Sequence, residues 1–215
     1  MLKETSSVAK TRLPLFSFFS EFQLPQLCLT FTVKAPKELL SLLNKKQINP
    51  SLFLMFYLAK TSLHIPQFRL REKAGTLMEV DSVTCSYLVQ SPLTQINFCY
   101  IPYQNHLNNF LVEAKEQEDK AAKAEHIQTK QNIKSPLIEV VAMPRLNITS
   151  ALSPVRNTKD ISTPLFTLGK IAQQTHCTSF SLTIRTHHGL VDGLHSAQFI
   201  DSLQNNLTQW VSQNK

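Results

Sequence analysis

The segment SFSLTIRTHHGLVDGLHSAQFIDSLQ, residues 179–204, contains a strand, a histidine-bearing turn and the start of a helix. Residues 179–187 are rich in β-forming residue types, which predicts a strand. Residues 193–211 place their large apolar residues at helical spacing, which predicts a final helix with one buried face. A turn held between a strand and a helix projects its side chains from a rigid scaffold, where binding and catalytic residues are common.

Two adjacent histidines in this turn, His187 and His188, are candidates for proton transfer, because imidazole titrates near neutral pH. Asp192 lies four residues beyond His188, and Gly193 allows the backbone to turn sharply after it. The same residues also fit an ordinary turn with surface histidines and an aspartate that caps the last helix. Successive residues at a strand end point to opposite sides, so at most one histidine faces a site, and the spacing does not say which.

The remaining elements follow from hydrophobic periodicity and turn residues. Helices are predicted at 14–22, 37–46, 51–64 and 104–131, and strands at 27–33, 67–72, 77–79, 83–89, 95–101, 138–142, 145–149 and 164–171. Residues 1–10 are polar and are expected to form a loose arm, followed by a single domain over residues 11–215. The mixture of elements, without repeats or a flexible linker, favours an α/β (α+β) domain in which helices pack on a mixed β-sheet.

Composition excludes several classes of protein. The chain has 215 residues, of which 42% are hydrophobic and 17% charged, so it can bury a substantial core. It has only 4 glycines, too scattered for a glycine-rich phosphate-binding loop. The N-terminus lacks the apolar core of a secretory signal, and the longest strongly apolar stretch, 52–59, is too short to span a bilayer. We therefore expect a soluble protein without a membrane partner.

Charge and cysteine usage narrow the partners further. The net charge is +7, but the basic residues are scattered among acidic ones, so we expect no nucleic-acid partner. The 4 cysteines form no CxxC pair and no zinc pattern with the nearby histidines, so we expect no metal. Free thiols of this kind are typical of a reducing cytoplasmic environment.

Several segments together resemble the chloramphenicol acetyltransferase family. HHGLVDGLH, residues 187–195, preceded by TPLFTLGK, residues 163–170, is similar to the family signature. PQFRLREKAGTLMEVDSVTCSYLV, residues 66–89, resembles its Pro-x-Phe-Arg segment, hairpin and Asp-Ser-Val strand. LNITSAL, residues 146–152, resembles its Asn-Ile-Ser-Ala segment. The resemblance extends over roughly residues 12–210.

This resemblance implies a two-layer sandwich that assembles as a homotrimer with active sites between subunits. It implies an acyltransferase that uses acetyl-CoA as co-substrate and a hydroxylated small molecule as acceptor, both bound in one ternary complex. The second histidine, His188, would be the general base, and the Ser150 hydroxyl would stabilise the oxyanion. Thr167 would hold a water near the intermediate, although a strand position chosen for β-propensity explains it equally well.

The resemblance also implies supporting residues. Asp192 would form a structural ion pair with Arg12, while the base would be oriented largely by its own backbone carbonyl. Lys170 would meet CoA phosphates, although a plain surface lysine is an equally good interpretation. The acceptor pocket would include Phe19, Ser20 and Thr94.

The sequence departs from the family after Ser150, where ALSPVRNTKDIS lacks a tryptophan and is short by about nine residues. Arg156, Lys159 and Asp160 replace apolar and amide residues there, which predicts a rebuilt acceptor wall. Two alternatives remain open at this point: a non-enzymatic trimeric binding protein on the same fold, and the catalytic domain of a dihydrolipoyl acyltransferase.

Overall fold

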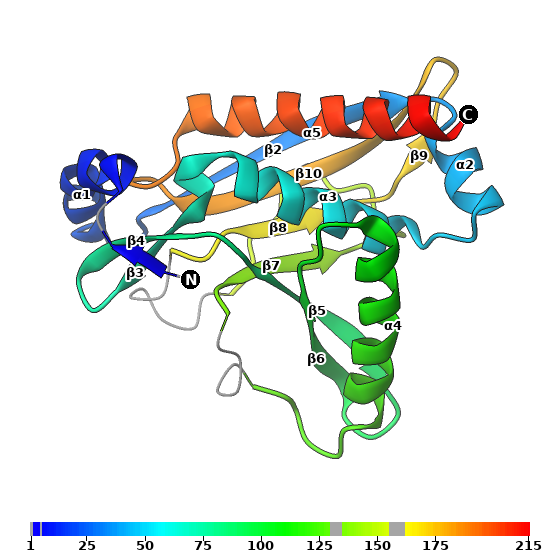
Figure 1. Ribbon diagram of the computed structural model, residues 1–215, viewed down its shortest axis with the longest axis horizontal. Helices are drawn as coiled ribbons and strands as arrows, with labels where there is room; N and C mark the ends of the chain where they lie inside the picture. Colours follow the sequence, from blue (N-terminus) through cyan, green and yellow to red (C-terminus); the bar gives the residue numbers. More distant parts are fainter. Residues whose placement is uncertain (1, 5, 130–134, 155–161) are drawn as a thin grey trace.

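The computed structural model describes residues 2–4, 6–129, 135–154 and 162–215 (Figure 1). Its main element is a 7-stranded sheet in the order β2-β10-β8-β7-β5-β6, with the short β9 also paired to β10. The strands are β2 (Gln26–Pro36), β5 (Thr84–Ser91), β6 (Gln95–Pro102), β7 (Leu137–Ala142), β8 (Leu165–Leu168), β9 (Ala172–Gln173) and β10 (Cys177–His187). β5, β7 and β8 run parallel to one another and the other pairs are antiparallel, so the sheet is mixed.

Helices α3, α4 and α5 pack on this sheet, and α1 and α2 lie near its two ends (Figure 1). The helices are α1 (Ser7–Ser20), α2 (Leu39–Lys45), α3 (Pro50–His64), α4 (Leu107–Lys123) and α5 (Gly193–Asn214), with a short 3-10 helix over Pro66–Arg69. A smaller sheet pairs β1 (Leu2–Glu4) and β3 (Leu70–Lys73) with β4 (Thr76–Val80). The expected class, an α/β (α+β) fold with helices packed on a mixed sheet, is confirmed.

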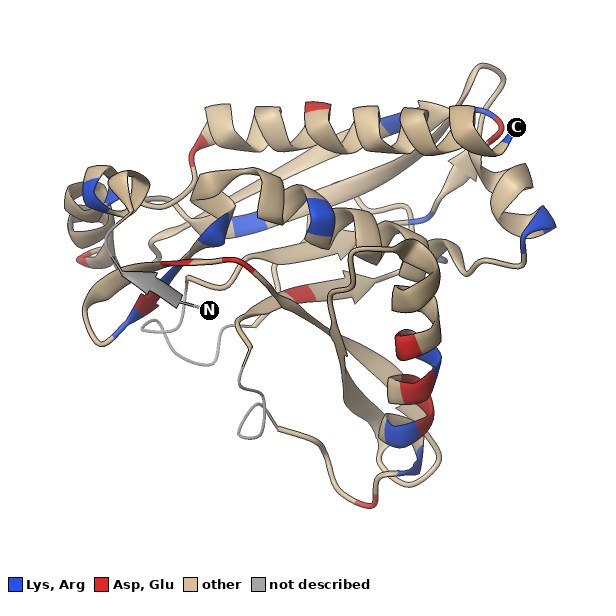
Figure 2. Ribbon diagram, viewed as in Figure 1, with Lys and Arg blue, Asp and Glu red and all other residues tan. Residues whose placement is uncertain are grey.

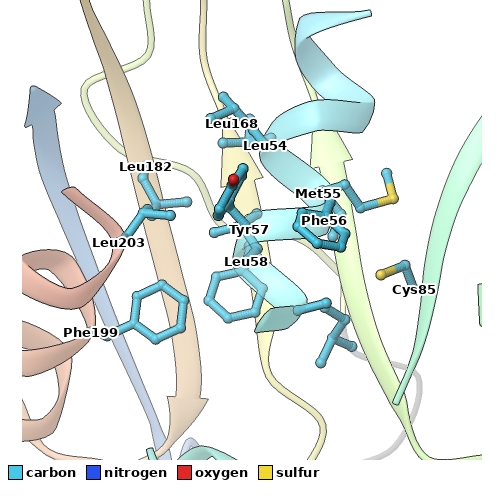
Figure 3. Close-up of a cluster of buried hydrophobic side chains, with 14 of the residues drawn as sticks. Leu54, Met55, Phe56, Tyr57, Leu58, Cys85, Leu168, Leu182, Phe199 and Leu203 are labelled. Atoms are coloured by element: carbon cyan, nitrogen blue, oxygen red, sulfur yellow. The ribbon is translucent and has the colours of Figure 1, made fainter. Parts of the chain in front are cut away.

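The core lies between the sheet and helices α3 and α5 (Figure 3). Leu182 on β10 and Leu168 on β8 are directly paired across the strands, and both point toward these helices. Phe199 and Leu203 of α5 meet them from the other layer. Burying one such side chain contributes about 1.5–3 kcal/mol to folding. α3 is apolar almost all round because its residues from Leu52 to Ala59 are all buried.

The opposite face of β10 is polar, because alternate strand residues point to opposite sides. Thr183, Arg185 and His187 lie on this face, away from Leu182. Arg185 is paired with Leu165 and Thr183 with Thr167 on the neighbouring strand. The candidate site residues of the sheet therefore lie on the side that does not build the core.

The structure corrects the prediction made for the N-terminal segment. Leu2–Glu4 pairs with β4 and α1 already begins at Ser7, so the described residues of the segment 1–10 do not form a loose arm. The Ser6 hydroxyl accepts a hydrogen bond from the Ala9 backbone N–H, an N-cap signal that starts the helix well before Pro14. Pro14 lies inside the helix rather than at its first turn.

Three other boundaries also differ from the prediction. The predicted strand 145–149 is an irregular segment in which Arg145 and Leu146 are exposed, so its apolar residues face no core. The predicted strand 67–72 begins as a 3-10 helix, because Pro66 opens a turn there. α4 ends at Lys123 instead of extending to residue 131; acidic and basic residues lie together on its outer side (Figure 2). The hairpin between β3 and β4 is as expected, with positive φ at Ala74 and Gly75.

Candidate active site

The turn after β10 packs closely on α1. His187 is the last residue of β10, and α5 begins at Gly193 with Asp192 as its N-cap. A Cβ atom on Gly189 would lie 2.5 Å from Cα of Phe16, a separation that side-chain carbons do not adopt. Glycine is therefore required at this position, and α1 contacts the turn directly. Gly193 is different: a Cβ atom there would meet nothing within 4 Å, so the sharp-turn role predicted for it is not needed.

The backbone around His188 is held from several sides. Its N–H donates to the carbonyl of Pro25 (2.8 Å), and its own carbonyl accepts from Nη2 of Arg12 (3.5 Å). Nε of Arg12 donates to the carbonyl of Gly189 (2.9 Å). The imidazole lies against the ring of Phe19, with ring centroids 4.3 Å apart. The ring is thus positioned by α1 and by the turn that follows it.

The orientation of this ring differs from the one implied by the resemblance. Nδ1 of His188 is buried and has no hydrogen-bond partner among the described residues, so it does not bond to its own carbonyl. That carbonyl instead accepts from Arg12. Nε2 makes no hydrogen bond within the described part of the chain, which leaves this nitrogen free to exchange a proton with a bound molecule.

Arg12 and Asp192 form the ion pair that the resemblance implied. Nη1 of Arg12 lies 3.2 Å from Oδ2 of Asp192, and the arginine side chain is only 10% exposed. Oδ1 of Asp192 accepts the backbone N–H groups of Leu194 and His195, which caps α5. Burial alone would raise the pKa of Asp192, but the hydrogen bond from His195 and the charges of His195 and Arg12 outweigh it and lower that pKa.

The pair gives a stability prediction. In a double-mutant cycle, Arg12→Leu and Asp192→Asn should each destabilise the fold, because each leaves the other residue without its counter-ion. Arg12→Leu should cost about 3 kcal/mol, since Arg12 also donates hydrogen bonds to two backbone carbonyls. Asparagine can still cap α5, which isolates the loss of charge. The coupling free energy from urea unfolding should be about 1–2 kcal/mol. Strictly additive losses would mean that the pair contributes no mutual stabilisation.

The pH dependence of the same cycle has a definite sign. The folded state lowers the pKa of Asp192 below its ordinary value of 3.8. The Asp192 carboxylate therefore stabilises the fold fully above pH 3.8, and this stabilisation is lost as the pH falls through the lower pKa of the folded state. Unfolding curves recorded from neutral pH downward should therefore converge for the wild type and Asp192→Asn in acid.

The other predicted site residues lie at or beyond the carboxyl ends of three strands: Thr167 and Lys170 at β8, Ser150 after β7 and Thr94 after β5. Thr167, on β8, is fully buried, and its hydroxyl has no partner among the described residues. Lys170 is exposed just beyond β8, and its N–H donates to the carbonyl of Leu146. Ser150 is exposed, two residues after Ile148, whose side chain lies close to Gly169. Thr94 lies in the β5–β6 turn and donates to the carbonyl of Ile96.

Thr167 and His188 are too far apart to meet at one reacting centre within a single chain. Thr167 is paired with Thr183 on β10, and His188, which directly follows the end of β10, lies five residues beyond Thr183. At about 3.3 Å per residue this separates them by roughly 16 Å. β8 and β10 are antiparallel, so residues after β8 and residues after β10 leave the sheet at opposite ends. The spacing of the motifs in the sequence did not indicate this separation.

Two further polar residues were missed by sequence reasoning. Nη1 of Arg185 donates to the carbonyl of Ser153 (2.9 Å), and Nη2 lies 3.8 Å from Oε2 of Glu139. These contacts tie the segment after Ser150 to the polar face of the sheet. Ser20, predicted for the acceptor pocket, donates to the carbonyl of Phe16 and contacts Nε2 of His187, so its hydroxyl is already engaged. Arg156, Lys159 and Asp160 lie outside the described residues.

The described residues contain no cluster of three or more His, Cys, Asp or Glu side chains that could hold a metal ion. Among the same residues, no helix is both long enough and apolar enough to cross a membrane. The four cysteines are free thiols, two of them buried.

Comparisons with known proteins define the class. A solved chloramphenicol acetyltransferase superimposes with a TM-score of 0.83 at 22% identity, covering 97% of this chain and 100% of the other. The cubic core of a pyruvate dehydrogenase multienzyme complex superimposes with a TM-score of 0.66 at 15% identity, covering 99% of this chain and 93% of the other. The fold is thus that of the CoA-dependent acyltransferases.

The family is narrower than this class. The chloramphenicol acetyltransferase family profile matches residues 10–204, so the chain belongs to that family and is an acyltransferase. A chloramphenicol acetyltransferase of Escherichia coli is 27% identical over 190 residues, 87% of this chain and 83% of the relative. One from Bacillus pumilus is 20% identical over 165 residues, 76% of this chain and 75% of the relative.

Proposed function

We propose that the protein transfers an acetyl group from acetyl-CoA to the hydroxyl of a small-molecule acceptor, with His188 as general base. The observation that carries the proposal is the arrangement of this one imidazole. Its backbone is held by Pro25 and Arg12, its ring lies against Phe19, and its Nε2 is left without a partner in the described chain. A base must be positioned in this way to meet the proton of a bound hydroxyl.

The reaction follows from these positions. Nε2 of His188 takes the proton of the acceptor hydroxyl, and the oxygen attacks the thioester carbonyl carbon. The carbonyl oxygen becomes an oxyanion, which accepts a hydrogen bond from the hydroxyl of Ser150; such a donor is worth about 10²–10³ in rate. The intermediate collapses, the C–S bond breaks, and the CoA thiolate takes the proton from His188. Thr167, a buried hydroxyl without a partner in the described chain, would hold a water near the intermediate.

The site needs a second chain if Ser150 and Thr167 take part. The roughly 16 Å between Thr167 and His188 along the sheet excludes contact of both with one reacting centre in a single subunit. We therefore propose a homotrimer with the sites at the interfaces, as the family resemblance implies. Leu88, Ile96 and Phe98 on β5 and β6 are 44%, 51% and 39% exposed, and burial against another copy would remove them from water.

Acetyl-CoA would approach the end of the sheet at which β8 finishes. Lys170 is exposed there and forms no ion pair with an acidic side chain among the described residues, so its ammonium group suits a CoA phosphate. Acetyl-CoA and the free thiols both fit a cytoplasmic protein.

The identity of the acceptor follows less directly from the described residues than that of acetyl-CoA. We expect chloramphenicol to be a poor acceptor. The acceptor wall after Ser150 lacks the family tryptophan, and a site loses affinity when an aromatic anchor is removed. We expect acetyl-CoA to bind normally and a different hydroxylated compound to be acetylated faster. The measurement is kcat/KM for chloramphenicol beside a panel of hydroxyl compounds, with release of the CoA thiol as the signal.

Three outcomes of this assay would favour other functions. A kcat/KM for chloramphenicol of about 10⁶ M⁻¹s⁻¹ or more would identify an ordinary antibiotic-resistance enzyme with a working pocket. Transfer to dihydrolipoamide alone would favour the dihydrolipoyl acyltransferase alternative. Failure to release thiol with any acceptor, together with ligand binding, would favour a binding protein on the same fold.

A further inference from the structure

His187, the other histidine of the pair, makes a complete set of hydrogen bonds within the protein. Its Nδ1 accepts the N–H of Gly189 (3.1 Å), and its Nε2 lies 3.1 Å from the hydroxyl of Ser20. The Ser20 hydroxyl in turn lies 2.6 Å from the carbonyl of Phe16, to which it donates. The His187 ring also packs against Phe16 in a tilted arrangement, with ring centroids 4.4 Å apart and an interplanar angle of 36°.

These contacts fix the protonation state of His187. Burial, and to a lesser extent the nearby His188, lower the pKa of His187 to about 4, so its ring is neutral at neutral pH. Since Nδ1 accepts a hydrogen bond, the single ring proton is on Nε2 and is donated to Ser20. The result is a directed series of three hydrogen bonds, from Gly189 through His187 and Ser20 to Phe16. We refer to this series as the His187 clamp.

The clamp joins the two structures that surround the base. At one end it binds the peptide that follows His188, and at the other it binds the last turn of α1. Phe19, which lies against the His188 ring, directly precedes Ser20 in that turn. Any movement of the last turn of α1 therefore moves Phe19 relative to the imidazole.

We propose that His187 and Ser20 form a positioning pair that holds Phe19 against the ring of His188 and so sets the orientation of the base. The inference rests on the proposed function of His188. His187 is not itself a second base, since both of its nitrogens are engaged and the residue is only 3% exposed. It is a positioning residue, which acts through Phe19 and Gly189.

The test uses Ser20→Ala and His187→Asn, with Ser17→Ala as the matched control. Ser20 and Ser17 are both exposed on α1, so neither substitution disturbs the core, and Ser17 takes no part in the clamp. Asparagine at 187 is too short to reach Ser20. We expect Ser20→Ala and His187→Asn each to lower kcat by about three- to tenfold, the effect of losing one neutral hydrogen bond. KM for acetyl-CoA should stay unchanged.

Two features separate positioning from a purely structural role. The double variant His187→Asn/Ser20→Ala should be no worse than the more damaged single variant, because both changes break the same series of bonds. The chemical reactivity of His188 toward diethyl pyrocarbonate, followed by mass spectrometry, should rise several-fold in both single variants and stay unchanged in Ser17→Ala.

The reactivity measurement requires no acetyl transfer, so it distinguishes failure of this inference from failure of the proposed function. Unchanged reactivity of His188 in both variants would overturn the positioning role, whatever the activity. If the wild type is active, an equal kcat in Ser20→Ala would also overturn it. If the wild type has no acetyltransferase activity but the reactivity of His188 still rises in the two variants, the clamp stands. Only the proposed catalytic role of His188 is then refuted.

Discussion

His188→Ala should lower kcat by about 10³-fold or more while KM for acetyl-CoA changes little. General base catalysis contributes about 10²–10⁴ to a rate, and alanine has no group that can take the acceptor proton. The side chain contributes little to the core, because the contacts that hold the turn are made by the backbone of His188 and by its neighbours Arg12 and Gly189. The loss should therefore fall in the chemical step, as kcat and direct binding of acetyl-CoA can show.

His187→Ala is the comparison for this variant. It should retain much more activity, since His187 acts only on the position of the base. Equal losses of kcat in the two variants would contradict the assignment of His188. A loss in His188→Ala that is matched by a fall in the unfolding temperature would also contradict it, because the change would then be structural.

The second large effect concerns the division of the site between chains. His188→Ala and Ser150→Ala should each be nearly inactive, the second because loss of an oxyanion donor costs about 10²–10³ in rate. If one chain supplies His188 and the next supplies Ser150, the two damaged chains can restore a site when they assemble together. Each mixed trimer then has one interface with both residues intact.

Co-expression of the two variants with different affinity tags should make this recovery measurable. Random assembly gives about three quarters mixed trimers, so about a quarter of all sites should be active. The control is His188→Ala co-expressed with the double variant His188→Ala/Ser150→Ala, which contains no intact base and should show no recovery. Mixed trimers no more active than their parents, or a fully active monomer in light scattering, would contradict a shared site.

Much of the fold was predictable because the relevant signals are local. The strand before His187 and the final helix follow from residue types and period, and α3 follows from Pro50 and a continuous apolar stretch. The predicted elements differ from the structure where a local sequence pattern has no matching contact with residues distant in the sequence. The apolar residues of 145–149 suggested a strand, but Leu146 faces solvent. The N-terminal helix begins earlier than Pro14 suggests, because Ser6, a polar residue in a polar segment, is its N-cap.

The candidate site was predictable only where its residues lie close together in the sequence. The histidine turn was found from its motif, and the pairing of Arg12 with Asp192 came only from the family resemblance, since 180 residues separate them. The contact between Ser20 and His187 crosses 167 residues and leaves no mark on local sequence. The opposite placement of Thr167 and His188 follows from the antiparallel pairing of β8 with β10, which residue spacing does not encode.

In the proposed reaction, acetyl passes directly from CoA to an acceptor hydroxyl, with His188 as the base. This reaction is tested by incubating the wild type and His188→Ala with deuterium-labelled acetyl-CoA and a panel of hydroxyl compounds, and then weighing the small molecules and the protein by mass spectrometry. We expect one labelled acceptor molecule for each CoA thiol released, an unlabelled protein, and no product with His188→Ala. A labelled acetyl group on a side chain of the protein, or equal product from His188→Ala, would contradict it.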